Sequence, residues 1–259
     1  MNIFFVYSNL EALTATIFVS LSDALVTLKI YYFVKNIRIL KQLMRKLDDE
    51  VFQPRNVKQR ALVQPSLNIW TATYIGFWVP AALTLTLWSV FPILDKSVQQ
   101  HRLPFAAWYP YDTKKSPFYE LTYLHQVVSI WFLSTANLHM DTMLTALMMY
   151  IGVQCDILCD NLKNLENELG YRMGFKEKLI DCIKHHKEIL SFAKNCNEFI
   201  NMIALGQFFT SAVSNGLSMF QLTLVAPFSS ECYSLLFFVG SITTQIFIYC
   251  WFGNEVEVK

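Results

Sequence analysis

The chain has 259 residues, of which 54% are hydrophobic and 16% are charged, whereas an average soluble domain has roughly 25% charged residues. Its mean hydropathy is +0.32. This composition is typical of a membrane protein, and a net charge of +1 argues against a general nucleic-acid-binding domain, which carries a concentrated basic patch.

Apolar stretches without charged residues locate the membrane spans, because a helix needs roughly 20 apolar residues to cross the hydrocarbon core. The first part of the chain is apolar but contains Glu11, Asp23 and Lys29. Since it lacks the basic leading region and the cleavage site of a signal peptide, we interpret it as a span as well. The sequence thus predicts an all-α polytopic membrane helix bundle with spans at residues 3–28, 66–92, 121–145, 199–225 and 233–252.

Lys and Arg residues are distributed unevenly among the connections between the spans. There are eight from Lys35 to Arg60, four in the next connection, seven from Lys163 to Lys194, and none around Pro227. Cytoplasmic loops carry an excess of Lys and Arg, so we expect the end of the chain to be cytoplasmic. With five spans residue 1 would lie outside the cell without a recognisable signal, which suggests that a segment precedes it.

Both cytoplasmic connections have apolar residues at helical spacing, and we predict amphipathic helices over residues 36–52 and 156–198. Gly170 and Gly174 are expected to break the second helix. His185 and His186 are interpreted as residues of its solvated surface. The apolar faces need a partner, either in the same chain or in another subunit. Their predicted members are Ile37, Leu40, Met44, Leu47 and Val51, then Leu158, Leu162, Leu165 and Leu169, and then Leu179, Ile183, His186, Leu190 and Ala193.

The outer connection, residues 95–120, is rich in proline and aromatic residues. Proline fixes the backbone and ends a helix, while aromatic rings can lie at the level of the lipid headgroups or fold over the bundle. Two interpretations stay open: an aromatic belt at the membrane surface, or a lid over a cavity. The residues of such a lid would be Pro104, Trp108, Tyr109 and Pro110.

Motifs of catalysis and metal binding are missing from the sequence. It has no phosphate-binding glycine loop, no HExxH pattern and no CxxC pair, and Cys155 and Cys159 have no histidines at ligand spacing. Apart from Glu11, ionisable residues lie at the ends of the spans, unlike in a transporter. We therefore expect no catalytic residue, no metal, no cofactor and no enzyme activity.

The spans offer residues that can line a cavity. Pro80, four residues after Gly76, is expected to kink its helix and loosen the packing around it. Aromatic walls with a few hydroxyl and amide groups suit a small, mostly apolar ligand, although small polar residues also bridge neighbouring helices in ordinary packing. The candidate ligand-binding residues are Trp78, Ala81, Leu85, Trp88, Gln126, Ile130, Leu133, Ser211, Ser214 and Phe237, with Asn215 and Phe238 beside them.

Three segments resemble the insect odorant receptor family, in the same order along the chain. They are "RLPFAAWYPYDTKKSPFYELTY", then "HHKEIL" followed by "FAKNCNEFINMIALGQ", and then "FIYCWFGNEV". The resemblance covers the chain from about residue 20 onward. The residues that match the outer loop of the family are Leu103, Pro104, Trp108, Tyr109, Pro110 and Pro117, and those that match the inner end of its penultimate helix are Tyr249, Cys250, Phe252, Gly253 and Glu255.

The resemblance implies a fold of seven membrane helices with an intracellular amino terminus, of which this chain holds five. It further implies an odorant-gated cation channel that assembles with a co-receptor subunit into a hetero-tetramer, in the plasma membrane of olfactory neuron dendrites. The cytoplasmic helix ends would form most subunit contacts, and the residues expected at this subunit-contact and gating end are Tyr249, Cys250, Gly253 and Glu255.

Because the family's first helix and its last, pore-lining helix have no counterpart here, the resemblance also implies an incomplete chain. Three alternatives stay open besides an odorant receptor subunit. One is a G-protein-coupled receptor, which would need the inverted topology. Another is a gustatory-type receptor, which shares the architecture. The third is a truncated, non-conducting membrane protein that only associates with complete subunits.

Overall fold

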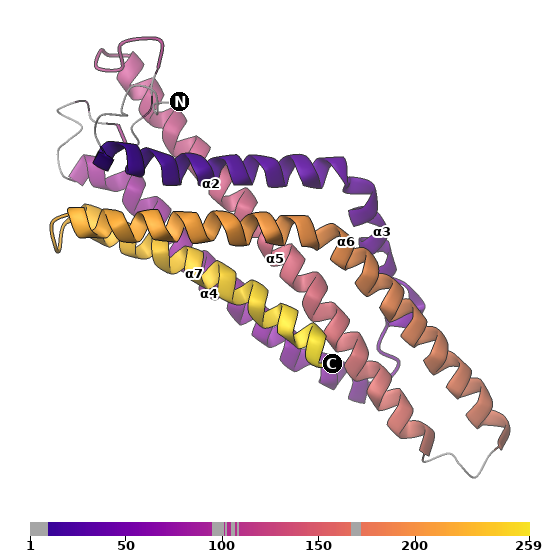
Figure 1. Ribbon diagram of the computed structural model, residues 1–259. Helices are drawn as coiled ribbons and strands as arrows, with labels where there is room; N and C mark the ends of the chain where they lie inside the picture. Colours follow the sequence, from indigo (N-terminus) through magenta and orange to yellow (C-terminus); the bar gives the residue numbers. More distant parts are fainter. Residues whose placement is uncertain (1–9, 95–100, 102, 105–106, 108, 167–171) are drawn as a thin grey trace. The chain divides into compact units, whose positions relative to one another are not determined.

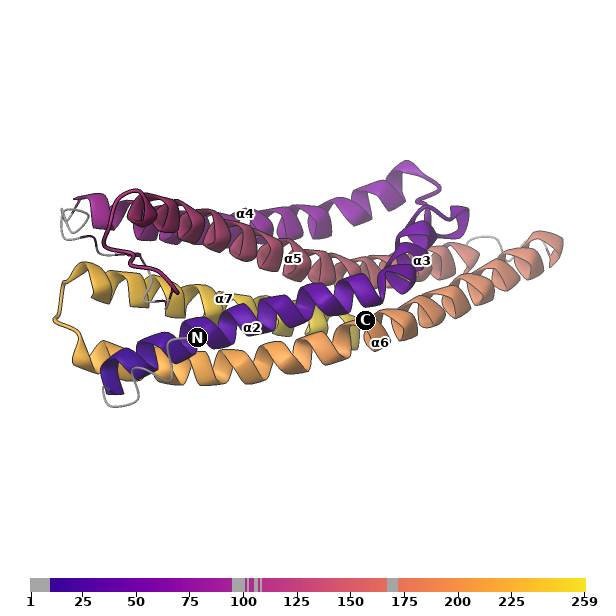
Figure 2. The same ribbon diagram turned by 90° about the horizontal axis from the view of Figure 1, so that it is seen from above.

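The computed structural model describes the chain except for residues 1–9, 95–100, 102, 105–106, 108 and 167–171. This described part is helical, without a β-strand, which confirms the predicted all-α fold class. Figure 1 shows the helices in chain order and Figure 2 shows them from above. They are α2 (Leu10–Lys35), α3 (Ile37–Leu47), α4 (Val57–Leu94), α5 (Phe118–Glu166), α6 (Arg172–Leu224) and α7 (Ser230–Val258), with a 3-10 helix at Glu50–Phe52.

Each predicted span falls on one of these helices. Residues 66–92, 121–145 and 233–252 lie within α4, α5 and α7, and residues 199–225 lie in α6 except for the last one. Of the span 3–28, residues 3–9 lie outside the described residues. By length and composition, three helices of the described part can cross a membrane: Val57–Val90, Phe118–Leu165 and Cys232–Val258. The number of five spans stays a prediction.

The two connections predicted to be cytoplasmic contain helices, but these helices end at other places than predicted. The segment 36–52 is divided at Asp48 and Asp49 into α3 and the 3-10 helix. Gly174 does not break a helix, because it lies within α6, while Gly170 lies outside the described residues. A single glycine costs a helix interior about 1 kcal/mol, which a helix of 53 residues tolerates.

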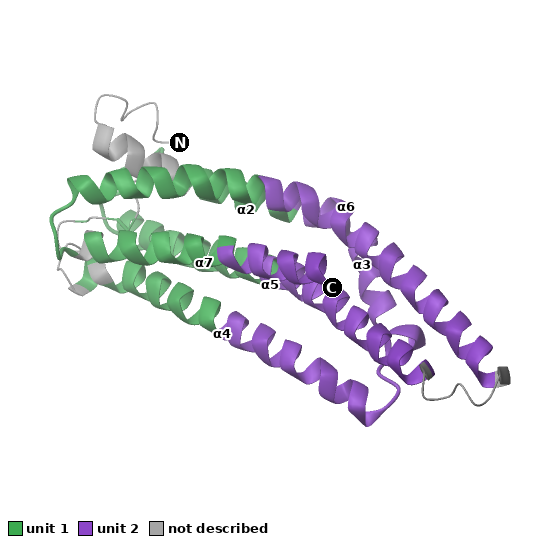
Figure 3. Cartoon of the chain, turned by 60° about the horizontal axis from the view of Figure 1, so that its bottom comes forward, with its two compact units in different colours: residues 1–30, 76–140, 206–246 green, residues 31–75, 141–205, 247–259 purple. Residues whose placement is uncertain are grey.

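The chain folds as two compact units, which Figure 3 colours separately. Unit 1 contains residues 1–30, 76–140 and 206–246, and unit 2 contains residues 31–75, 141–205 and 247–259. Five helices, α2 and α4 to α7, contribute one segment to each unit. Because every unit is assembled from distant parts of the sequence, neither unit is a separate stretch of chain.

Polar side chains join the helices of unit 1. Lys29 of α2 is only 2% exposed, and its Nζ donates a hydrogen bond of 2.8 Å to Oδ1 of Asn137 on α5. Within this unit α6 and α7 lie side by side (Figures 1 and 2), joined by a 2.8 Å hydrogen bond from Gln207 Nε2 to Gln245 Oε1. Hydrogen bonds of this kind connect neighbouring helices in apolar bundles, where the hydrophobic effect between helices is weak.

Unit 2 has an aromatic core around Phe52, whose ring centroid lies 5.8 Å from that of His185 and 6.1 Å from that of Tyr150. Nε2 of His185 lies 3.0 Å from Oε1 of Gln154, and Nε2 of Gln154 donates to the carbonyl of Phe52, also at 3.0 Å. The prediction that His185 lies on a solvated face is therefore wrong, since this residue is buried. His186, next to it, is exposed, although it was also a member of the predicted apolar face.

The buried faces of the unit 2 helices also differ from the predicted faces. Ile37 and Met44 of α3 are 41% and 44% exposed, and Ile183 and Leu190 of α6 are exposed as well. On α6 a second face one position away contains large aromatic rings, which bury more area than aliphatic side chains. The predicted members Leu40, Leu158 and Leu165 are buried. The buried residues outside the predicted faces are Leu43 on α3, and Cys182, His185, Ile189, Phe192, Cys196 and Phe199 on α6.

Candidate ligand cavity

Unit 1 contains a cavity of about 160 Å³, walled by segments of α2, α4, α5, α6 and α7. Half of the residues that line it are polar, but most of the lining surface is apolar. The sequence predicted mostly apolar and aromatic walls with a few polar groups, and the lining surface has this character, although more of the lining residues are polar than the sequence indicated. A cavity of this kind fits a small ligand that has an apolar body and a polar group.

Most of the predicted ligand-binding residues lie at this cavity, and three do not. Trp78, Gln126 and Phe237 do not line it, while Phe77 and Phe238, the sequence neighbours of two of them, do. With 3.6 residues per helical turn, a shift of one position turns a side chain by about 100°. The predicted residues that line the cavity are Ala81, Leu85, Trp88, Ile130, Leu133, Ser211 and Ser214. Whether they contact a ligand stays a prediction.

Aromatic rings of α4 and α7 form one apolar wall. The rings of Trp88 and Phe238 are stacked, with centroids 6.1 Å apart and an angle of 25° between their planes. Leu85, one turn before Trp88, is 6% exposed and lines the cavity beside Phe77. This wall can bury the apolar surface of a ligand, which is the main source of affinity for small molecules of low polarity.

Polar residues of α6 and α7 form another part of the lining. Gln207 is 5% exposed, and its Nε2 donates to Ser211 Oγ and to Gln245 Oε1, both at 2.8 Å. Among the residues that the structure describes, Gln207 Oε1 and the hydroxyl oxygens of Ser214 and Ser241 have no hydrogen-bond partner. The cavity therefore presents buried polar atoms that a ligand can satisfy.

Several of these polar residues were missed by sequence reasoning, which selected Ser211 and Ser214 only. A usable signal was present, since Gln207, Ser211, Ser214 and Ser218 recur at helical spacing on one face of an uncharged stretch. Other lining residues gave no such signal. Asp23, Asn137 and Gln245 are single polar residues in apolar surroundings, and only the packing of the helices places them at the cavity.

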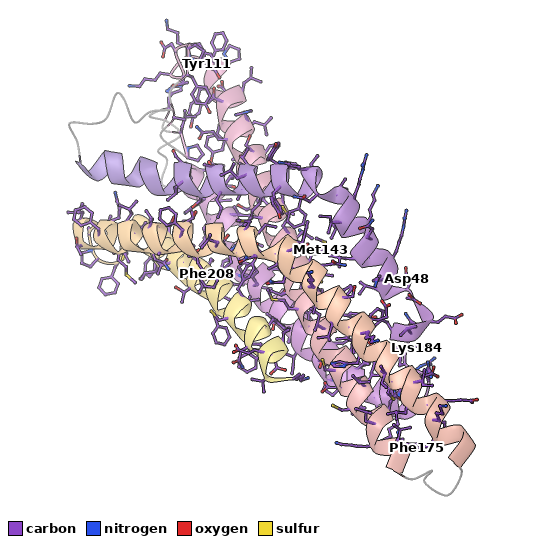
Figure 4. All side chains as sticks on the ribbon, turned by 45° about the vertical axis from the view of Figure 1, so that its right-hand side comes forward. Asp48, Tyr111, Met143, Phe175, Lys184 and Phe208 are labelled. Atoms are coloured by element: carbon purple, nitrogen blue, oxygen red, sulfur yellow. The ribbon has the colours of Figure 1, made fainter. Side chains whose placement is uncertain are left out.

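The outer connection packs on the beginning of α5. Tyr109 Oη accepts a hydrogen bond of 3.2 Å from Gln126 Nε2, and Tyr111 Oη lies 2.9 Å from Oγ1 of Thr122. The ring of Tyr111, labelled in Figure 4, also contacts the rings of Tyr109 and Phe118. Of the predicted lid, Trp108 lies outside the described residues, and Pro104, Tyr109 and Pro110 do not line the cavity. The role of a lid stays a prediction.

The residues expected at the subunit-contact and gating end lie on α7 in unit 2. Tyr249 is 4% exposed and donates a 2.7 Å hydrogen bond to the buried carboxylate of Asp141. Cys250 is exposed, and Gly253 and Glu255 are half-buried. Because Tyr249 is buried within its own chain, only Cys250, Gly253 and Glu255 offer accessible surface, and their expected role stays a prediction.

Two groups outside the membrane spans have chemically distinctive surroundings. Burial, and then the positive charge of Arg55, lower the pKa of His185. Burial raises the pKa of the Cys196 thiol to about 12, so this cysteine is inert. In the part of the chain that the structure describes, no three His, Cys, Asp or Glu side chains lie close enough together to hold a metal ion.

Comparisons with known proteins first give the class of protein. The sequence matches the family described as "7tm Odorant receptor" over residues 8–259. The chain therefore belongs to the odorant receptor family, and this confirms the resemblance found in the sequence.

Individual relatives agree with this assignment. Odorant receptor Or1 of Anopheles gambiae is 25% identical over 93% of this chain and 63% of that protein. Odorant receptor 46a, isoform A, of Drosophila melanogaster is 22% identical over 97% of this chain and 66% of that protein. This chain thus spans about two thirds, or slightly less, of the length of these relatives.

A solved structure gives the same fold. The insect olfactory receptor OR5 from Machilis hrabei, in complex with eugenol, has a TM-score of 0.83 to this chain at 21% identity. The alignment covers 96% of this chain and 64% of that one. At this level of identity the similarity shows the fold, a polytopic bundle of membrane helices.

Proposed function

We propose that this chain is the odorant-binding subunit of a ligand-gated cation channel, which it forms with a co-receptor subunit in the plasma membrane of olfactory neuron dendrites. The observation that carries the proposal is the cavity of unit 1, in a chain of the odorant receptor family. The subunit would bind a small volatile molecule without changing it chemically, as a receptor and not as an enzyme.

The size of the cavity supports a small volatile ligand. Its volume of about 160 Å³ is close to the ~150 Å³ of an apolar protein cavity that holds benzene. The OR5 structure from Machilis hrabei contains eugenol. A ligand that buries about 250 Å² of apolar surface gains roughly 6 kcal/mol before the costs of association. Burial alone therefore supports an affinity no tighter than roughly micromolar.

Gating follows if the open and closed conformations of the channel bind the ligand differently. A ligand shifts a conformational equilibrium only by the difference between its affinities for the two states. The odorant would thus bind more tightly to the conformation with an open pore. The wall formed by the stacked rings of Trp88 and Phe238 is one part of the cavity where such a difference in affinity can arise.

Exposed apolar residues of unit 2 support an assembly with another subunit. Met44 on α3 and Ile180, Ile183 and Leu190 on α6 are 40 to 57% exposed. These segments belong to the predicted cytoplasmic helices, where lipid does not cover them. An apolar face in water needs a protein partner, and the co-receptor would supply it.

Replacing Trp88 by alanine tests the proposal. The change removes an aromatic wall from the cavity, so the concentration of odorant for half-maximal current should rise about tenfold for aromatic odorants, which corresponds to 1.4 kcal/mol. The measurement is the odour-evoked current in cells that express this chain together with a co-receptor. Phe132→Ala is the control, because Phe132 is a 68% exposed aromatic residue of α5 that does not line the cavity.

The outcomes separate the alternatives. An unchanged dose response of the Trp88→Ala variant across a broad odorant panel would remove this wall from the binding site. Co-purification with the co-receptor without any odour-evoked current would instead indicate a non-conducting protein that only associates with complete subunits. A response to sugars or bitter compounds without the co-receptor would indicate a gustatory-type receptor.

A further inference from the structure

The hydrogen bonds of Gln207 determine which polar group the cavity can accept. Both donor positions of its amide are in use, because Nε2 donates to Ser211 Oγ and to Gln245 Oε1. With Gln245 Oε1 as its partner, rotating the Gln207 amide by 180° would bring two oxygens together, so the orientation of Gln207 follows from that of Gln245. Oε1 is thereby left as a buried acceptor without a partner among the described residues.

The neighbouring polar groups leave this acceptor unsatisfied. The hydroxyl of Thr84, which also lines the cavity, donates to the carbonyl of Pro80 at 2.8 Å. Nζ of Lys29 donates to Asn137 Oδ1. A hydroxyl group can both donate and accept a hydrogen bond. The hydroxyl groups of Ser214 and Ser241 have no partner among the described residues, so both roles are open to a ligand. A buried acceptor without a donor loses its hydration on folding, and a ligand that brings a donor would compensate for this loss.

We propose that the cavity selects compact apolar molecules that carry one hydrogen-bond donor, alcohols and phenols, over molecules of equal size that carry only an acceptor or no polar group. This inference rests on the proposed function and specifies the ligand class. The ligand O–H donates to Gln207 Oε1, the ligand oxygen can accept from Ser214 or Ser241, and the apolar body lies against Trp88 and Phe238.

Three probes of similar size test the proposal. Benzyl alcohol carries a donor, benzaldehyde carries only an acceptor, and ethylbenzene carries neither. Binding is measured by calorimetric titration of the full chain in lipid nanodiscs. One hydrogen bond to a buried, otherwise unsatisfied group should make benzyl alcohol bind about tenfold more tightly than either of the other two.

Variants of the chain test whether Gln207 Oε1 is the acceptor that causes the preference for ligands with a donor. Gln207→Met keeps the length of the side chain and removes Oε1, so the three probes should then bind equally within about twofold. Gln221→Met is the matched control, since Gln221 is a buried glutamine of the same helix that does not line the cavity. Ser211→Ala keeps Gln207 and frees one of its N–H groups, and benzaldehyde should then bind about fivefold more tightly.

The outcomes keep this inference separate from the proposed function. If benzyl alcohol, benzaldehyde and ethylbenzene bind equally well to the unmodified chain, the donor preference is wrong while the odorant site stands. If none of them binds and no odorant evokes a current, the proposed function itself fails. If Asp23→Leu, which removes both carboxylate oxygens, abolishes the preference and Gln207→Met does not, the acceptor is Asp23, and the assignment to Gln207 is overturned.

Discussion

His185 is a buried residue on a helix that also carries an exposed histidine. Its ring packs against Phe52, and Nε2 lies 3.0 Å from Gln154 Oε1. Because burial and Arg55 lower its pKa, the folded chain binds a proton at His185 less readily than the unfolded chain does. The stability that this difference provides is complete above the unfolded pKa of about 6.5 and is lost as the pH falls towards the folded pKa.

We therefore predict that the thermal unfolding temperature of the chain falls as the pH is lowered from 7 to 5.5, and that His185→Gln makes this fall smaller. Glutamine keeps an N–H donor for Gln154 but does not titrate. Carboxylates with ordinary pKa values of about 4 contribute little in this range, and the comparison with the unmodified chain isolates the contribution of His185. The measurement is thermal unfolding in detergent at several pH values.

His186→Gln provides the control for this experiment. His186 is exposed, so its removal should leave the pH dependence of the unmodified chain unchanged. Equal pH dependence in the His185→Gln variant and the unmodified chain would show that another group is responsible.

At the scale of the helix, the sequence predicted where the elements lie but not which face each one buries. Uncharged apolar stretches were sufficient to place α4, α5, α6 and α7, because only helices satisfy the backbone of a long apolar segment in lipid. The cytoplasmic part of α6 has two apolar faces, and periodicity alone cannot choose between them. The choice depends on rings from other helices, such as Phe33 and Phe52, which contact Phe199 and Phe192.

Two neighbouring residues of α3 test which face is buried. Leu43 is 1% exposed and Met44 is 44% exposed. Leu43→Ala should destabilise the isolated chain by about 2 to 5 kcal/mol, because it leaves a cavity in unit 2. Met44→Ala should change the stability by less than about 0.5 kcal/mol, as expected for a surface position. Thermal or denaturant unfolding of the purified chain provides both values.

The same two variants also test the proposed assembly with a co-receptor subunit. Since Met44 belongs to the exposed apolar face of α3, Met44→Ala should reduce co-purification with the co-receptor even though the isolated chain stays stable. Equal losses of stability in the Leu43→Ala and Met44→Ala variants would contradict the structure, in which Leu43 is buried and Met44 is exposed.

The candidate site was predictable to the extent that it lies on regular helices. The spacing of Trp78, Ala81, Leu85 and Trp88 predicted that they share one face, and all of them except Trp78 line the cavity. The polar end was not predictable, because the orientation of the Gln207 amide depends on Gln245, a residue 38 positions away in the sequence. Contacts of this kind arise only when two helices are packed together.

At the scale of the whole molecule, the distribution of Lys and Arg predicts how the chain crosses the membrane. We expect an epitope tag inserted between Lys114 and Lys115 to be accessible on intact cells, and a tag after Lys259 to be accessible only after permeabilisation. Both tags can be placed in the same chain, so that each serves as the control for the other in immunofluorescence. Accessibility of the second tag on intact cells would indicate the opposite orientation.

Five helices supply the walls of the unit 1 cavity, and none of them supplies more than five of the lining residues. Substitutions at residues that do not touch one another change a free energy nearly additively. Under the proposed function, a lineage of receptors with this architecture can therefore change its odorant preference one wall at a time, by single substitutions on separate helices. Such stepwise change allows duplicated copies to diverge towards different odorants while the helices that hold the fold stay the same.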